Sequence, residues 1–181
     1  MKVTTLLFSA LLFSKAALAQ TGTLLVYGNL DIASSKASTG VKSNAFSLSP
    51  GVGYQFNDHW TAGANLAVSS TKTGEPQIKT STFGAGPFIR YAYPLSDIFA
   101  VYVQLNANYI TGKSDGLKSN GFSGHLFPAI GVNLKNGFAL NFNFGSLGIV
   151  SSKPKSGETA TSFILSFGSG AGFGISKNFG L

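Results

Sequence analysis

The chain has 181 residues, of which 44% are hydrophobic and only 10% are charged, with a formal net charge of +7. A soluble globular domain usually has about 25% charged residues, so this composition, with 23 glycines, does not suit an ordinary soluble enzyme. The absence of cysteine excludes disulfides, thiol catalysis and thiolate metal sites.

The first residues have the features of an export signal. Lys2 provides a basic start, residues 6–13 form a short apolar segment, and Ala17-Leu18-Ala19 is a small-residue cleavage site. The apolar segment is too short for a helix that spans a bilayer. We therefore predict a signal peptide at residues 1–19 and a single domain at residues 20–181.

After the signal, apolar residues recur at every second position in eight separate segments. In the first segment Leu24, Val26 and Leu30 share one face, and Tyr27 and Asn29 lie on the other. Successive side chains of a β-strand point to opposite faces, so each segment is predicted to be a strand. The strands are expected at residues 23–32, 46–56, 60–70, 83–93, 99–109, 122–134, 138–144 and 161–179.

The last segment shows the pattern most clearly. Phe163, Leu165 and Phe167 share one face, and glycine occupies every second position from Gly168 to Gly174 on the other. A tilted strand of about 9–11 residues crosses the hydrocarbon of a bilayer, and this segment is long enough. It can also close a sheet on the first strand.

The connections between strands alternate in length. Short turns are expected at residues 57–59, 94–97 and 135–137, and long polar loops at residues 33–43, 71–79, 111–121 and 150–160. Short turns at one end and long loops at the other are the layout of an outer-membrane barrel. An even number of strands places both termini at the short-turn end, which is periplasmic in such barrels.

The composition of the two faces indicates which one meets lipid. The polar faces hold Gly, Ser, Asn and Thr, with Asp31 and Arg90 as their only charges. A soluble eight-stranded barrel such as a lipocalin is the alternative, but its water-facing side would carry many Lys and Glu residues. We therefore place the polar face in a narrow lumen and the apolar face, with aromatic girdles near both ends, against lipid.

Three prolines interrupt this pattern. Pro50, Pro87 and Pro128 each remove a donor from the ladder of backbone hydrogen bonds, and a closed barrel has no edge strand to accommodate them. Each lies at the same distance before a short turn, within a repeat of about forty residues. Local bulges are expected at this height, and a side passage for apolar solutes is the alternative.

The export signal, the eight amphipathic strands and the segment 50–58, Pro-Gly-Val-Gly-Tyr-Gln-Phe-Asn-Asp, resemble the small bacterial outer-membrane β-barrel family of the OmpX, OmpW and OmpA-barrel type. The resemblance covers residues 20–181. It implies an all-β, eight-stranded antiparallel up-and-down transmembrane β-barrel in the bacterial outer membrane. It also implies that the barrel insertion machinery acts on the chain.

The lumen of an eight-stranded barrel is just wide enough for side chains to fill it. Inward amides such as Gln104, Asn106 and Asn141 can bridge gaps, so we expect a mostly plugged barrel. Inward glycines either leave space for water or admit the aromatic rings opposite, so a narrow channel for small or apolar solutes is the alternative. The lumen candidates are Tyr27, Asp31, Phe88, Arg90, Tyr102, His125 and Phe127.

No convincing catalytic set is present in the sequence. Some small outer-membrane barrels modify lipid A with a Ser–His–acid set, and Ser123, His125 and Asp31 share the inward face at similar heights. Serine is common in this chain, so a lipid A-modifying enzyme is only the second alternative, and we expect no enzymatic activity. Two histidines without clustered carboxylates indicate no metal site, and no cofactor is expected.

The predicted long loops are rich in lysine. They hold three acidic residues, Glu75, Asp115 and Glu158. They hold eight basic residues, Lys36, Lys42, Lys72, Lys79, Lys113, Lys118, Lys153 and Lys155. They form either a solvated surface or a contact site for lipopolysaccharide phosphates or another anionic partner. We expect a structural or surface-interaction role, with outer-membrane lipid and lipopolysaccharide as partners, an extracellular ligand left open, and no nucleic acid.

Overall fold

The computed structural model describes residues 22–36, 41–74, 78–155 and 157–180, apart from the side chains of residues 169–171. The predicted signal peptide lies outside the described residues. One short 3₁₀ turn, η1 (Lys135–Gly137), joins the sixth and seventh strands, and no helix among the described residues is long and apolar enough to cross a membrane. The strands are β1 (Thr23–Lys36), β2 (Lys42–Gln55), β3 (Trp60–Thr73), β4 (Ile78–Pro94), β5 (Phe99–Ser114), β6 (Leu117–Asn133), β7 (Phe138–Pro154) and β8 (Ala160–Gly180).

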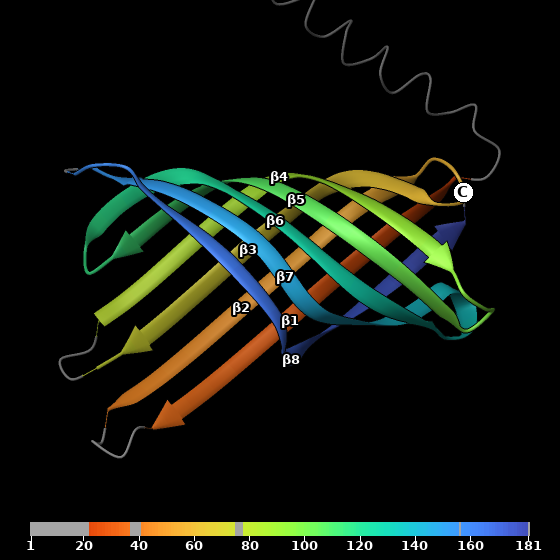
Figure 1. The fold of residues 1–181 in the computed structure, drawn as a ribbon, viewed down its shortest axis with the longest axis horizontal. Helices are drawn as coiled ribbons and strands as arrows, with labels where there is room; N and C mark the ends of the chain where they lie inside the picture. Colours follow the sequence, from red (N-terminus) through yellow and green to blue (C-terminus); the bar gives the residue numbers. More distant parts are fainter. Residues whose placement is uncertain (1–21, 37–40, 75–77, 156, 181) are drawn as a thin grey trace, which may run out of the picture.

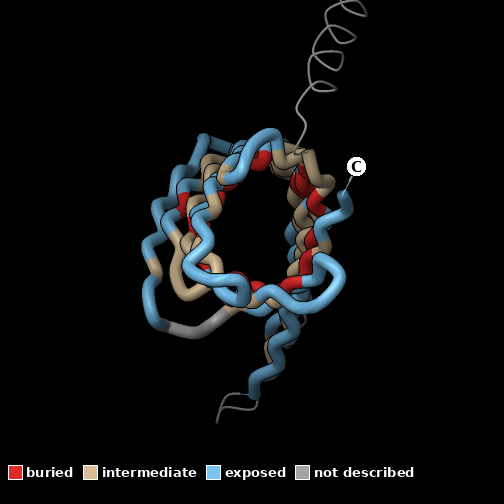
Figure 2. Tube along the Cα trace, turned by 90° about the vertical axis from the view of Figure 1, so that its right-hand side faces the viewer, coloured by how far each residue is buried: buried red, intermediate tan, exposed pale blue. Residues whose placement is uncertain are grey.

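The strands form one closed antiparallel barrel in sequence order, with β8 paired to β1 (Figure 1). Seen end-on, the trace is a ring (Figure 2). Thr23 pairs with Gly180, so the described ends of the barrel lie together at the end that carries the short turns. The predicted eight-stranded up-and-down β-barrel is therefore confirmed.

The strands are longer than the alternation predicts, because the long connections are mostly hairpin extensions. Residues 111–121, expected as a loop, contain the ends of β5 and β6 and a two-residue turn at Asp115 and Gly116. These two residues have φ angles of 46° and 84°, the left-handed geometry of a tight hairpin turn. Seven of the eight candidate lysines consequently lie in strands, and only Lys155 lies in a turn.

Burial is inverted relative to a soluble protein. Outward side chains such as Leu66, Phe83 and Ile89 are 40–48% exposed, whereas polar inward residues such as Asn65 and Gln104 are buried. Since exposed apolar surface of this extent requires an apolar surrounding, the outward face suits lipid. Rings cluster near both ends of this face, for example the edge-to-face Trp60–Tyr91 and Tyr109–Phe122 pairs, with centroids 4.9 and 5.3 Å apart.

Three inward glycines make room for the aromatic rings opposite. A Cβ atom at Gly51 would overlap the ring of Tyr27, and one at Gly53 or Gly63 would lie 2.6–2.8 Å from the ring of Phe88. Any larger residue at Gly51 or Gly53 would therefore displace a ring, and at Gly63 it would first meet the backbone of Val52 and Gly53. The sequence left two explanations for the inward glycines, space for water or room for the aromatic rings opposite. At these positions the structure supports room for the rings.

The prolines disturb the ladders in two ways. Pro128 lies where the β6–β7 register shifts between Leu126 and Ala129, which is the predicted bulge. At Pro50 and Pro87 the β2–β3 and β4–β5 ladders are interrupted without a change of register, so the predicted bulges are absent there. A missing N–H removes one hydrogen bond without requiring an extra residue, so an interruption alone is sufficient at Pro50 and Pro87.

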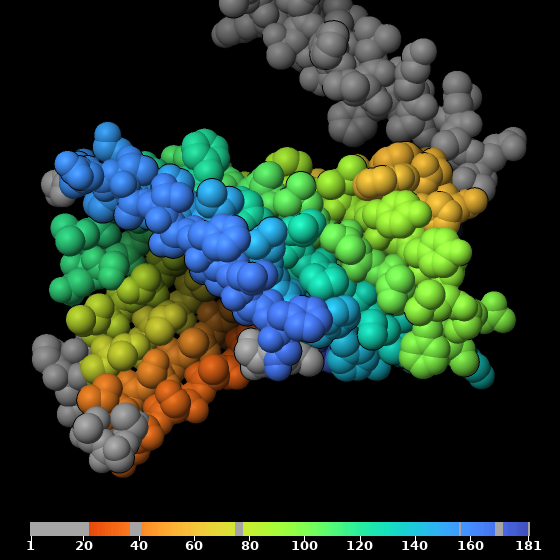
Figure 3. Space-filling view, viewed as in Figure 1, coloured from red at the N-terminus to blue at the C-terminus, as the bar shows by residue number. Residues whose placement is uncertain are grey.

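The seam between β1 and β8 is closed over only part of its length. Their register ends at Asn29 and Gly174, so the rest of β1 pairs with β2 alone. At the same level β8 has extra residues: Asn143 of β7 faces Gly172 but Gly145 faces Phe167, and Gly168 has a φ of 70°. Figure 3 shows a hollow between the blue β8 and the orange β1 beyond this point.

Candidate functional site

Six buried side chains from four strands gather in the lumen and form what we call the lumenal cluster. All are no more than 8% exposed. Inward strand positions supply them, as the sequence alternation predicts. The lumenal cluster consists of Tyr27 of β1, Phe88 and Arg90 of β4, Tyr102 and Gln104 of β5, and Phe127 of β6.

Gln104 is the hydrogen-bonding centre of the lumenal cluster and is fully buried. Its Oε1 accepts a 2.8 Å hydrogen bond from Nε of Arg90. Its Nε2 donates to the hydroxyl of Tyr27 at 2.9 Å and to Oδ1 of Asn106 at 2.8 Å. One amide therefore connects β1, β4 and β5 across the lumen.

Arg90 is a buried cation whose described contacts include no carboxylate. Its Cζ lies 4.1 Å from the ring centroid of Tyr102 and 5.0 Å from that of Tyr27. Cation–π attraction and the Gln104 hydrogen bond therefore replace the counter-charge that a buried guanidinium usually has. The centre of the lumen is consequently positive.

The lumen holds a cavity of about 260 Å³ on the long-hairpin side of the lumenal cluster. Asn65 and Asn108 line it, and the Oδ1 atom of each is buried without a hydrogen-bond partner in the described structure. Ser123 and His125 also line it. Buried orphan acceptors of this kind usually bind water or another donor.

The residues of the hypothetical Ser–His–acid set do not form a connected site. Ser123 and His125 share the cavity, but among the described residues no hydrogen bond joins them, and His125 instead lies against Phe127 with ring centroids 5.6 Å apart. Asp31 is exposed, pairs with Ser47 of β2, and lies beyond the point where β1 and β8 separate. Asp31 thus differs from the other lumen candidates, because its part of β1 has no β8 neighbour to bury it.

No cluster of three or more His, Cys, Asp or Glu residues that could hold a metal ion occurs among the described residues.

The lysines of the hairpins lie on the outward face, in phase with the apolar residues below them. The register places three pairs directly opposite each other: Lys36 with Lys42, Lys72 with Lys79, and Lys113 with Lys118. Like charges in such positions repel each other. The sequence interpretation gave the count of lysines but not this pairing, which depends on hairpin register.

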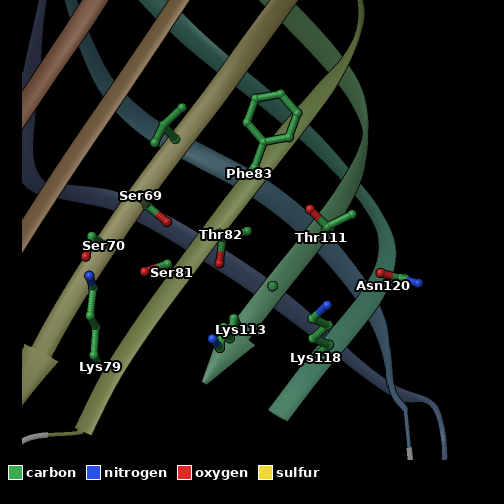
Figure 4. Close-up of a pocket in the computed structure, with 12 residues that line it drawn as sticks. Ser69, Ser70, Lys79, Ser81, Thr82, Phe83, Thr111, Lys113, Lys118 and Asn120 are labelled. Atoms are coloured by element: carbon green, nitrogen blue, oxygen red, sulfur yellow. The ribbon is translucent and has the colours of Figure 1, made fainter. Parts of the chain in front are cut away.

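Lys79, Lys113 and Lys118 lie on three successive strands around an outward depression of about 630 Å³ (Figure 4). We call this depression the lysine pocket. Val68 and Phe83 line its apolar side, and Ser81 and Asn120 lie among the lysines. Sequence reasoning missed this pocket, although the shared alternation phase of these lysines and the lipid-facing residues was a usable signal.

Comparisons with known proteins agree with the fold. The outer membrane protein beta-barrel domain family model matches residues 4–181. The crystal structure of OprG from Pseudomonas aeruginosa has 16% identity over 90% of this chain and 98% of its own, with a TM-score of 0.51. The crystal structure of Neisserial surface protein A has 14% identity over 88% and 97%, with a TM-score of 0.49.

The search of curated proteins gave no match. At 16% identity the OprG structure supports the fold alone, whereas the family model spans nearly the whole chain. The closed eight-stranded barrel, its lipid-compatible outer face and this match agree with one another. The chain belongs to the outer membrane protein beta-barrel domain family and is a protein of the bacterial outer membrane.

Proposed function

We propose that this barrel does not conduct and acts as a structural or surface-interaction protein through its lysine-rich hairpins. The single observation that supports this role most is the lumenal cluster, in which buried Arg90 and Gln104 join three strands across the lumen. An eight-stranded barrel has little room beyond its own side chains. The function would then be carried by the surface of the barrel rather than by a pore.

The hairpins supply the surface for this role. Their lysines form like-charge pairs on the outward face, so an anionic component of the envelope would relieve the repulsion. Lipopolysaccharide phosphates are the anions that an outer-membrane barrel meets at its cell-surface end. Insertion of the barrel would depend on the barrel insertion machinery, as for the family in general.

A narrow channel is the second candidate function, favoured by the cavity beside the lumenal cluster. Single-channel recording in planar bilayers separates the two. We expect the wild-type protein to be silent, because the buried rings of Phe88 and Tyr102 lie within the lumenal cluster, and the Phe88→Ala/Tyr102→Ala variant to conduct. Steady conductance of the wild type would contradict the proposed function.

The proposal includes no enzymatic activity, because Ser123, His125 and Asp31 are not joined by hydrogen bonds among the described residues. Catalysis by such a set requires the nucleophile and the base within hydrogen-bond reach.

A further inference from the structure

The lysine pocket combines cations with neutral hydrogen-bonding groups. Lys113 faces Lys118 directly across β5 and β6, and Ser81 of β4 faces Lys113. Among the described residues no ion pair neutralises Lys79, Lys113 or Lys118, although Asp115 shares a smaller neighbouring depression with the first two. Because opposed like charges destabilise a hairpin, a bound anion would be stabilising here.

A second depression of about 580 Å³ continues from the lysine pocket towards the short-turn end. The paired residues Phe83 and Thr111 line the lysine pocket, and the next outward pair on the same strands, Ala85 and Tyr109, lines the second depression. The two are therefore consecutive along β4 and β5. We call the second depression the small-residue groove.

The lining of the small-residue groove is narrow and apolar. Ala85, Pro87, Ala107 and Gly124 present little side-chain volume. Tyr109, Phe122 and Ile149 also line the groove. The interrupted ladder at Pro87 falls within it. A shallow apolar channel on the lipid-facing side of a barrel fits an extended acyl chain better than it fits a bulky side chain.

We propose that the lysine pocket and the small-residue groove together bind one phosphorylated glycolipid of the outer leaflet. The phosphates would contact Lys79, Lys113 and Lys118, and an acyl chain would lie in the groove. Several separated ammonium groups can meet more than one phosphate, and Ser81 and Asn120 can bond sugar hydroxyls. This inference rests on the proposed surface-interaction role. It identifies the class of ligand and the part of the barrel surface that binds it.

The first test compares two double variants with the same change of charge. The protein is folded in a non-ionic detergent and titrated with bisphosphorylated, hexa-acylated lipid A, and the bound fraction is measured by native mass spectrometry. Lys113→Gln/Lys118→Gln should weaken binding at least about tenfold, because it removes charge-assisted hydrogen bonds to phosphate. Lys135→Gln/Lys177→Gln, both at the short-turn end of the barrel, should change it by less than about twofold.

The second test addresses the acyl chain and the source of the phosphate. Ala107→Trp should fill the groove and weaken lipid A binding, whereas Ala62→Trp, also outward-facing but on β3 outside the groove, should not. A large excess of inorganic phosphate should fail to displace lipid A, because free phosphate lacks the acyl contacts. Heat-modifiable migration on unboiled gels checks that every variant is folded.

Equal loss of binding in the two double variants would overturn the lysine pocket and indicate a diffuse surface attraction. Undiminished binding of dephosphorylated lipid A would overturn it as well. Both outcomes are independent of conductance: a conducting wild-type barrel would contradict the plugged lumen without changing lipid A binding.

Discussion

At the scale of single residues, Gln104 is the position on which the lumenal cluster depends most. Replacing it with Leu would leave Nε of Arg90 without its acceptor and the Tyr27 hydroxyl without its donor, both in a buried site. Each buried polar group left unpaired costs about 1–3 kcal/mol. We therefore expect Gln104→Leu to lower the free energy of unfolding by about 2–5 kcal/mol, measured by urea titration in detergent micelles.

Asn44→Leu is the matched control for this prediction. Asn44 also uses its side-chain amide, accepting a 2.7 Å hydrogen bond from Ser34, but that bond is exposed. Its loss should change the free energy of unfolding by less than about 0.5 kcal/mol, since water replaces the partner. If the two variants were equally stable, the Gln104 hydrogen bonds would contribute nothing net.

Arg90 makes a prediction about ion preference once the lumen is opened. In Phe88→Ala/Tyr102→Ala the buried guanidinium stays in the lumen, where a fixed charge in a confined space attracts counter-ions. The opened barrel should therefore prefer chloride to potassium, measured as a reversal potential in a salt gradient. Adding Arg90→Gln should remove this preference, whereas adding Lys135→Gln at a short turn should leave it in place.

Which residues enter the lumen could be predicted from the sequence, and how they pair could not. Alternation assigns Tyr27, Phe88, Arg90, Tyr102 and Phe127 to the inward face, because neighbouring side chains of a strand must point apart. It gives no relative height between distant strands. The bond from Gln104 to Tyr27 joins residues 77 positions apart, so it depends on the register of the whole barrel.

At the scale of strands, the sequence predicted the number and order of the strands correctly, but the predicted strands are shorter than those of the structure. Alternation is visible only where one face meets lipid and the other the lumen. Beyond the membrane both faces meet water, so Ser and Thr occupy both, Lys replaces the apolar residues on the outward face, and the hydrophobic period disappears. The ends of β5 and β6 around Asp115 and Gly116 are therefore strands without an alternating signal.

The seam between β1 and β8 leads to a prediction about backbone protection. In β1, alternate amides point to β8, and beyond Asn29 these have no partner strand. We expect the β8-directed amides of residues 30–36 to exchange with solvent much faster than those of residues 24–28, because exchange reports local hydrogen bonding. Hydrogen exchange followed by NMR in micelles measures each amide separately.

Strand β2 provides the internal control for that measurement. Phe46 and Leu48 lie at the same level as the open part of β1 but are paired to both β1 and β3. Their amides should exchange slowly. Uniformly slow exchange along β1 would contradict this prediction. It would mean that β8 continues to pair with β1 past Gly174 and that the extra residues of β8 do not lie near Gly168.

At the scale of the whole molecule, the two ends of the barrel differ in a way that indicates its direction in the membrane. One end carries the short turns and the paired residues Thr23 and Gly180, and the other carries the long hairpins with their opposed lysines. Outer-membrane barrels have short periplasmic turns and longer extracellular loops. We therefore expect the lysine pocket to lie at the cell surface, beside the outer leaflet.

Single cysteines test this direction directly, because the chain contains no cysteine of its own. Ser114→Cys, at the tip of the β5–β6 hairpin, should react with a membrane-impermeant maleimide on intact cells. Ser96→Cys, in a short turn, should react only after the outer membrane is permeabilised, because the barrel encloses no path wide enough for the reagent. Labelling is read as a mass shift of the purified protein. Labelling of Ser96→Cys alone on intact cells would show that the barrel has the opposite orientation. The lysine pocket would then lie at the periplasmic leaflet, which would rule out an outer-leaflet glycolipid as its ligand.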